Sequence, residues 1–360
     1  MDIVSILEFI GALAALIFIH ELGHFLAAKL FKVEVEEFGF GIPPRAVTLF
    51  KTGGTIVSLN WIPLGGFVRL KGDTDPSIPG GLAAANPWKR IGVYLAGPAM
   101  NLLAAVLLYA IIFAKIEAPD LTRLNDVIIA AIAQNSPAEV NGLQPNDQIL
   151  EVNGQAVKNI DSLQTMVAQN LGKEITLTLQ RGAETRQIKL TPRQNPPENE
   201  GAIGIGLSYP TVKVNFITAL PAGAYATYEQ CVGLLTMIGK LISGQIPSSQ
   251  GRLVGYKGMY DMFQNVRSSG DTNGYPAWIG VLGFFTSITI SLGLLNLLPI
   301  PALDGGRIVI SALPQIILRK RLSPEFENVA IGISFLLLIV LLVVVNLQDI
   351  ISPIQLPPAP

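Results

Sequence analysis

The 360-residue chain has little charge and almost no cysteine or histidine. Its single cysteine, Cys231, excludes an intrachain disulfide and a cysteine-based metal cluster. The net charge is −1, and no run of Lys and Arg alternates with aromatic residues, so no nucleic-acid partner is expected. Charged residues make up 14% of the sequence and hydrophobic residues 50%. This balance is too apolar for an ordinary soluble protein and predicts a membrane protein.

Four apolar runs are long enough to cross a bilayer as helices, which takes about 20 residues. The first run lacks the basic start and the small-residue cleavage pattern of a signal peptide, so we expect it to be retained. The fold class predicted is therefore an α-helical polytopic membrane protein with four transmembrane helices, at 3–30, 91–114, 277–298 and 329–347.

Basic residues in short loops indicate which ends of these helices face the cytoplasm. Lys and Arg gather after the first span, for example at Arg45 and Lys89, and between the last two spans, for example at Arg319. Both loops lie on the same side of a four-span protein. We therefore expect a multi-pass protein of the cell (inner or plasma) membrane with these loops in the cytoplasm. The termini and the long 115–276 region would then be extracytoplasmic.

The segments between the spans predict further structure. The stretch 48–70 alternates around Gly53-Gly54 and includes the apolar run 61–67, which predicts a membrane-associated β-hairpin. Strand-like runs at 127–132, 148–152, 174–180, 185–190 and 202–207, with an Asn153-Gly154 turn and a polar loop at 193–201, predict a small, inserted β-rich domain. An apolar run interrupted by Glu229 and Lys240 predicts a helix at the membrane interface. The expected order is a first transmembrane helix at 1–32, a cytoplasmic β-hairpin region at 33–90, a second transmembrane helix at 91–115, the β-rich domain at 121–209, the interfacial helix and a connecting segment at 213–275, a third transmembrane helix at 276–306, a cytoplasmic loop at 307–328 and a fourth transmembrane helix at 329–348.

The only two histidines lie at the end of the first span, in His20-Glu21-Leu22-Gly23-His24. Residues four apart share one face of a helix, so both imidazoles can bind one Zn²⁺ while Glu21 accepts a proton from the attacking water. A chance origin is disfavoured, because ionisable groups are rare inside apolar spans. The motif predicts His20 and His24 as zinc ligands and Glu21 as the catalytic base.

Catalytic zinc takes three protein ligands and keeps one open position for water. No third histidine exists, so the remaining ligand must be a carboxylate or Cys231. Asp304 is the leading candidate, because it lies at the edge of the third span, where an ionised group needs a partner. Pro299 and Pro301 before it would break the helix. The alternative role for Asp304 is to cap the helix that follows.

These two motifs together resemble the site-2 protease family, and within it the RseP-like branch. In that family the first-span HExxH motif and a later NxxPxPxLDG motif, here residues 296–305, jointly hold zinc. The likeness extends to 39–41, 63–66 and 97–101. It implies an intramembrane zinc endopeptidase that hydrolyses transmembrane segments of single-span membrane proteins, such as anti-sigma factors or remnant signal peptides, with its active site near the cytoplasmic side.

The resemblance also covers the β-rich domain, since residues 136–138 and 142–154 resemble a PDZ domain. There is room for one such domain, where RseP has two. The domain would bind a peptide ligand by strand addition or act as a steric plug. The resemblance further implies substrate-binding or transition-state roles for Asn296, Gly65 and Gly66. The Asn296 amide could instead bond carbonyls freed by the broken helix, and Asn101 has the same two readings, with a helix contact favoured.

Two other functions would use some of the same residues. A metal-binding transporter would explain the spans and the His and Asp side chains, but not Glu21 beside them or the PDZ-like domain. An inactive scaffold would use the PDZ-like domain, but the HExxH motif is intact. The expected partners are therefore single-span membrane protein substrates, membrane lipid and a peptide ligand if the PDZ-like domain binds one.

Overall fold

A computed structural model of the chain describes residues 2–197, 200–245, 251–269 and 276–354. The chain divides into two compact units, one made of residues 1–112 and 223–360 and the other of residues 113–222. Parts of two sequence predictions, at 198–199 in the polar loop and at 246–250 and 270–275 in the connecting segment, lie outside the described residues. Each unit has its own core and is described by itself.

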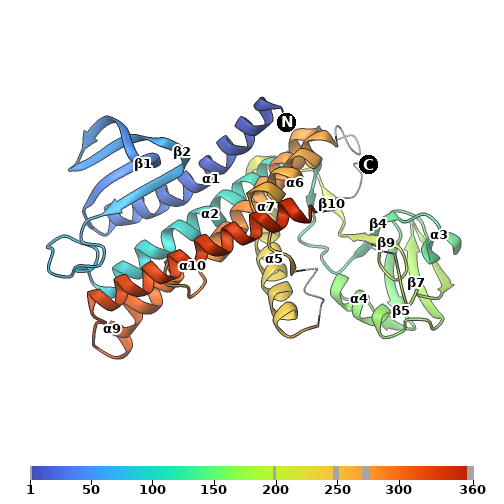
Figure 1. Ribbon diagram of the computed structural model, residues 1–360. Helices are drawn as coiled ribbons and strands as arrows, with labels where there is room; N and C mark the ends of the chain where they lie inside the picture. Colours follow the sequence, from blue (N-terminus) through green and yellow to red (C-terminus); the bar gives the residue numbers. More distant parts are fainter. Residues whose placement is uncertain (1, 198–199, 246–250, 270–275, 355–360) are drawn as a thin grey trace. The chain divides into compact units, whose positions relative to one another are not determined.

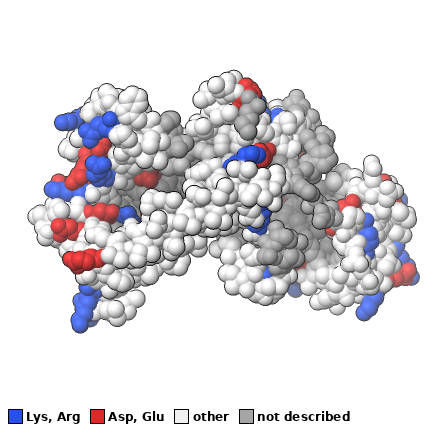
Figure 2. All heavy atoms as spheres, viewed as in Figure 1, with Lys and Arg blue, Asp and Glu red and all other residues white. Residues whose placement is uncertain are grey.

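Within the described residues, four helices are long and apolar enough to cross a membrane, and all of them lie wholly or mainly in the first unit. They agree with the predicted spans in number and position, and α1 has the predicted bounds. Two of them begin four or five residues earlier than the apolar runs, because polar side chains cap them: Asn86 Oδ1 accepts the Trp88 N–H and Ser323 Oγ accepts the Phe326 N–H. The surface over α10 is almost free of charged side chains (Figure 2). The four helices are α1 (Ile3–Leu30), α2 (Pro87–Ile116), α7 (Ala277–Asn296) and α10 (Pro324–Ile351) (Figure 1).

The chain between α1 and α2 forms a sheet of two long, bent strands, β1 (Val35–Thr52) and β2 (Thr55–Leu70). The first part of β1 lies between the two parts of β2, since Phe38 pairs with both Val57 and Val68. The order of segments across the sheet is thus 45–52, 55–60, 35–40 and 66–70. The predicted hairpin around Gly53-Gly54 is present, but the sheet begins at Val35 rather than near residue 48. Sequence alternation could not reveal this second pairing.

An ion pair between the buried Glu37 and the partly exposed Arg45 joins these segments. Glu37 is 3% exposed and accepts hydrogen bonds from the Arg45 guanidinium at 2.7 and 2.6 Å and from Ser58 Oγ at 2.7 Å. The Arg45 guanidinium, helped by Ser58 and Arg69, holds the pKa of Glu37 below its usual value. Arg69 Nη1 also lies 3.4 Å from Glu37 Oε2, so one carboxylate ties all four segments together.

The same unit holds further helices besides the four spans. The helix predicted within 213–275 is present as α5, although its first residues belong to the other unit. Its position at the membrane interface stays a prediction. The sequence did not assign a shape to 248–274, and part of it forms α6. Asp349 of α10 accepts the Gly255 and Gly258 N–H groups at 2.8 and 3.0 Å, and so caps α6 from a neighbouring helix. These helices are α5 (Phe216–Ile242), α6 (Tyr256–Ser268), α8 (Asp304–Arg307), the π-helical turn η2 (Ile308–Ala312) and α9 (Leu313–Ile317).

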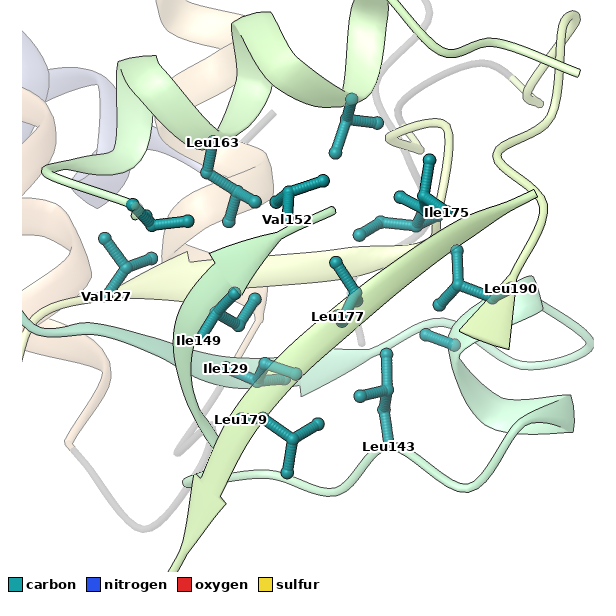
Figure 3. Close-up of a cluster of buried hydrophobic side chains, with 14 residues drawn as sticks. Val127, Ile129, Leu143, Ile149, Val152, Leu163, Ile175, Leu177, Leu179 and Leu190 are labelled. Carbon is teal, nitrogen blue, oxygen red and sulfur yellow. The ribbon is translucent and has the colours of Figure 1, made fainter. Parts of the chain in front are cut away.

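The second unit is the β-rich domain, whose main sheet has the order β8-β7-β5-β4-β9, with β6 beside β5. The helix α4 covers the sheet, and Leu163 of α4 meets Val152, Ile149 and Leu177 in the core between them (Figure 3). The strands predicted at 127–132 and 148–152 are confirmed. The last strand starts at Ile205 rather than Ala202, because residues 201–204 form a turn in which the Gly204 N–H donates to Gly201 O at 3.0 Å and Gly204 has a φ of +74°. The elements are β3 (Ala118–Pro119), β4 (Val127–Ile132), α3 (Pro137–Val140), β5 (Gln148–Val152), β6 (Gln155–Ala156), α4 (Ile160–Ala168), β7 (Ile175–Arg181), β8 (Glu184–Leu190), β9 (Ile205–Ser208) and β10 (Thr211–Val212).

Candidate metal centre

The two histidines of α1 lie on one buried face of the helix, and each is 6% exposed. Glycines allow α2 to approach this face closely. A Cβ atom on Gly23 would lie 2.3 Å from Ala96 O, and one on Gly97 would lie 2.3 Å from His24 Nε2. Both distances are far below van der Waals contact, so only glycine fits at either position. The histidines are therefore enclosed by backbone, which fixes their rotamers.

The third predicted ligand comes from the broken end of α7. The helix stops at Asn296, and after the proline-rich turn Asp304 is the first residue of α8. The turn folds back tightly on itself: a Cβ on Gly305 would lie 2.1 Å from Leu297 O, and one on Gly306 would lie 1.9 Å from Ile300 O. The residue at the cap position is Leu303, so Asp304 is not the helix cap that the sequence left as its alternative. Its carboxylate faces the histidines instead.

Three ligand atoms converge on one point. Asp304 Oδ2 lies 3.2 Å from His20 Nε2 and 3.3 Å from His24 Nε2, and the two Nε2 atoms are 3.2 Å apart. A tetrahedral ion with bonds of about 2.0 Å holds its ligand atoms about 3.3 Å apart. The three atoms thus form one face of a tetrahedron of the size that Zn²⁺ requires, and His20, His24 and Asp304 are a group that could hold a metal ion.

The hydrogen bonds around this triangle favour a cation at its centre. His24 Nδ1 lies 2.8 Å from Val93 O, which can only accept, so Nδ1 donates and the neutral ring presents a lone pair at Nε2. Asp304 Oδ2 is buried and has no hydrogen-bond partner. Acceptor atoms that face one another in a buried site repel unless a cation neutralises them. The donor set of two imidazoles and one carboxylate fits zinc.

Asn101 of α2 is a residue whose role the sequence did not identify. It is fully buried, and its amide lies 3.1 Å from His20 Nδ1, while Oδ1 has no partner as the amide is placed. When the His20 ring binds a metal through Nε2, its proton lies on Nδ1, which then needs a hydrogen-bond acceptor. Rotation of the Asn101 amide exchanges Nδ2 and Oδ1 and places Oδ1 there as the acceptor. Asn101 therefore contacts a ligand of the metal, rather than serving only as a helix contact. The polar residue in a span was the signal available in the sequence.

Glu21 lies beside the triangle, next to the sheet. Its Oε2 accepts the Val68 N–H of β2 at 3.1 Å. The two glycines predicted at this sheet lie against α1: a Cβ on Gly65 would lie 2.5 Å from Ile17 Cγ2, and one on Gly66 would lie 3.5 Å from Phe18 Cδ2. Their positions bring β2 against α1, one turn before the HExxH motif. Their predicted contact with substrate stays a prediction.

Two other predicted residues lie apart from the triangle. The Asn296 side chain donates from Nδ2 to Leu292 O at 3.0 Å, so its amide bonds a carbonyl of its own helix. Cys231, the alternative third ligand, lies within α5 and does not belong to the group around His20. Among the described residues, the geometry therefore selects Asp304.

Comparison with known proteins gives one family match over most of the chain. The description of Peptidase family M50 matches residues 8–341. A Clostridium perfringens protein named as a zinc metalloprotease is 32% identical over 346 residues, covering 95% of this chain and 97% of the relative. The Bacillus subtilis regulator of sigma-W protease RasP is 27% identical over 431 residues, covering 96% of this chain and 98% of the relative.

Several solved structures match the chain, and one of them matches part of it. The crystal structure of the PDZ domain of an SdrC-like protein from Listeria monocytogenes covers 23% of this chain and 87% of that domain, at 20% identity and a TM-score of 0.21. That score is too low to support an argument about fold or ligand.

Proposed function

The chain belongs to peptidase family M50 and is a zinc metalloprotease, and on this premise we propose that it cuts the transmembrane segments of single-span membrane proteins. The observation that carries the proposal is the triangle of His20, His24 and Asp304 ligand atoms, 3.2 to 3.3 Å apart and buried among apolar helices, with Glu21 beside it. A peptidase site at such a place serves substrates that are themselves in the membrane.

The roles of the residues follow from their positions. His20, His24 and Asp304 hold Zn²⁺, which lowers the pKa of water and polarises a carbonyl when it is bound. Glu21 takes a proton from the attacking water and later gives a proton to the leaving amine. Its hydrogen bond from Val68 fixes the carboxylate on the sheet side of the site. The enclosing backbone of α2 keeps bulk water from the imidazoles.

The outer edge of β2 is the proposed place for the substrate backbone. The Val68 N–H points away from β1 toward Glu21, and the N–H groups of Gly66 and Leu70 have the same direction because strand residues alternate. An unwound substrate segment can add to this edge as a further strand, since strand addition satisfies backbone groups that lipid cannot. We assign contact with this segment to Gly65 and Gly66, and assign the remaining hydrogen-bonding capacity of Asn296 to the substrate strand or its oxyanion.

The partners follow from the same proposal. Lipid surrounds the exposed apolar side chains of α10, and single-span proteins reach the site through the bilayer. The name of the Bacillus relative connects that protein to sigma-W regulation, so anti-sigma factors are leading substrates, with remnant signal peptides as a second class. The PDZ-like domain would select substrates by binding a peptide at the edge of β9 or by excluding bulky ectodomains.

Reconstitution tests this function. The purified chain in lipid vesicles should cut a single-span test protein within its apolar segment, with the cleavage site located by mass spectrometry. A chelator that removes zinc should reduce the rate by at least about 100-fold, because the metal activates the water, and added Zn²⁺ should restore it. A matched substrate with a large folded ectodomain reports on the PDZ-like domain. Cleavage only of soluble loops, or a rate indifferent to the chelator, would refute the proposal.

The proposed topology has its own test. We place the β1–β2 sheet and the loop before α10 in the cytoplasm, following the distribution of basic residues. With Cys231 replaced by serine, single cysteines at Arg45 and Arg319 should react with a membrane-impermeant thiol reagent only from the cytoplasmic side. One at Asn195 should react only from outside. Labelling of all three positions from one side would contradict the four-span arrangement.

A further inference from the structure

An ion pair connects the turn that bears Asp304 to the end of the sheet. Arg307 is the last residue of α8, and its Nη1 lies 2.5 Å from Oδ2 of Asp73, in the loop that directly follows β2. The hydroxyl of Tyr94, from α2, lies 3.5 Å from the other oxygen of Asp73. Tyr94 is 4% exposed. Three elements that form the candidate metal centre thus meet at one carboxylate.

The Asp304 turn needs such external contacts. The helix α8 has four residues, and its cap residue Leu303 makes no side-chain cap hydrogen bond. Gly305 and Gly306 pack the turn against its own backbone, which shapes the turn but does not anchor it to α1 or α2. Two hydrogen bonds do reach other elements: Ala302 N–H donates to Ser334 Oγ of α10 at 3.3 Å, and Arg307 donates to Asp73.

A buried apolar cluster lies beside the residues that flank the Asp73–Arg307 ion pair. Ile308, the residue after Arg307, packs against a buried cluster that contains Leu82, Val93 and Tyr94. Val68 and Leu70 of β2 pack against the same cluster. Val93 supplies the carbonyl that orients His24, and Val68 supplies the N–H that orients Glu21. A displacement of this cluster would therefore affect His24, Glu21 and the turn that bears Asp304.

We infer that Asp73 and Arg307 form a positioning pair that sets the distance of Asp304 from the histidines and couples it to the end of β2. The inference rests on the proposed function, since it deepens the role of the same site. The side chains are 33% and 29% exposed, so as a simple surface ion pair they would add little to global stability. Ligand positions, however, must be held to within about 0.5 Å, and a contact with a small effect on folding can control that distance.

Metal affinity is the measurement that separates positioning from folding. The full-length chain in detergent, stripped of metal, is titrated with Co²⁺ and followed by its visible absorption. Asp73→Asn and Arg307→Gln should each weaken Co²⁺ binding about tenfold, since groups that orient ligands typically change metal affinity by 10- to 100-fold. The double variant should bind Co²⁺ no more weakly than the weaker-binding of the two single variants, because both substitutions break the same interaction.

A neighbouring ion pair provides the control. Glu34 and Lys71 form a contact of 2.7 Å at the same edge of the sheet, and Glu34→Gln should leave Co²⁺ affinity within about twofold of the wild type. Asp73→Glu, which keeps the charge, should recover most of the affinity. The melting temperature of the metal-free protein should match between Asp73→Asn and Glu34→Gln.

Two results would overturn the inference. One is an Asp73→Asn protein with wild-type affinity. The other is a loss of affinity that is matched by an equal loss of stability in the metal-free protein, which would make the pair a general structural contact. The Co²⁺ titration does not depend on cleavage activity. A wild type that binds Co²⁺ but cuts no membrane substrate would refute the proposed function and leave the affinity result standing.

Discussion

A Glu21→Gln protein should keep about one zinc ion per chain and cleave its substrate at least about 100-fold more slowly, because an amide cannot take a proton from water at neutral pH. Glutamine preserves the size of the side chain, and its amide oxygen can still accept the Val68 N–H that Glu21 accepts at 3.1 Å. The sheet and the metal ligands should therefore stay in place. Metal analysis and cleavage rates on the same sample separate the two effects.

The matched control for this variant lies on the same helix. Glu8 of α1 pairs with Arg267 at 3.0 Å, and its side chain is about half exposed. Glu8→Gln removes one carboxylate from α1 without touching the site, so both zinc content and cleavage rate should be unchanged. Normal turnover by Glu21→Gln would remove this residue from the mechanism. Loss of zinc together with activity would instead make Glu21 a group that maintains the metal site.

The sequence predicted those features of the molecule that are determined by residues close together in the chain. Helical spacing places His20 and His24 on one face without knowledge of any other element. Apolar length predicts the four spans, and the β-branched residues of 127–132 and 148–152, bounded by turn signals, predict strands of the β-rich domain. In each case the residues that determine the structure are neighbours along the chain.

Features that depend on the meeting of distant segments could not be predicted in this way. In the sequence, Gly97 does not differ from other glycines in apolar helices. Only the fold shows that a Cβ atom on Gly97 would lie 2.3 Å from His24 Nε2. Asn101 lies 81 residues from the ring that it contacts. The bending of β1 and β2 into four segments likewise depends on pairing between residues such as Phe38 and Val68. These contacts are tertiary, and no periodicity along the chain records them.

Asp304 is intermediate between these cases, because a motif suggested its role but only the fold brings it to the histidines. An Asp304→Asn protein should bind zinc at least about 100-fold more weakly and lose detectable cleavage. A neutral amide is a poor ligand for Zn²⁺, and two imidazoles alone do not complete a catalytic site. Competition with a chelator of known affinity measures the first effect, and the reconstituted cleavage assay measures the second. His20→Ala combined with His24→Ala should abolish zinc binding altogether and defines the lower limit.

The same substitution distinguishes a metal ligand from a residue that stabilises a helix start. Asn and Asp stabilise helix N-termini to a similar degree, so a structural role for Asp304 would survive the change. Asp75 is the control, since its Oδ1 accepts the Ser77 N–H at 2.9 Å in an exposed turn where asparagine can replace it. Asp75→Asn should therefore leave zinc binding and cleavage intact. An Asp304→Asn protein with full zinc and near-normal proteolysis would mean that the oxygen 3.2 Å from His20 Nε2 is not a metal ligand, and Cys231 would then be the next residue to replace.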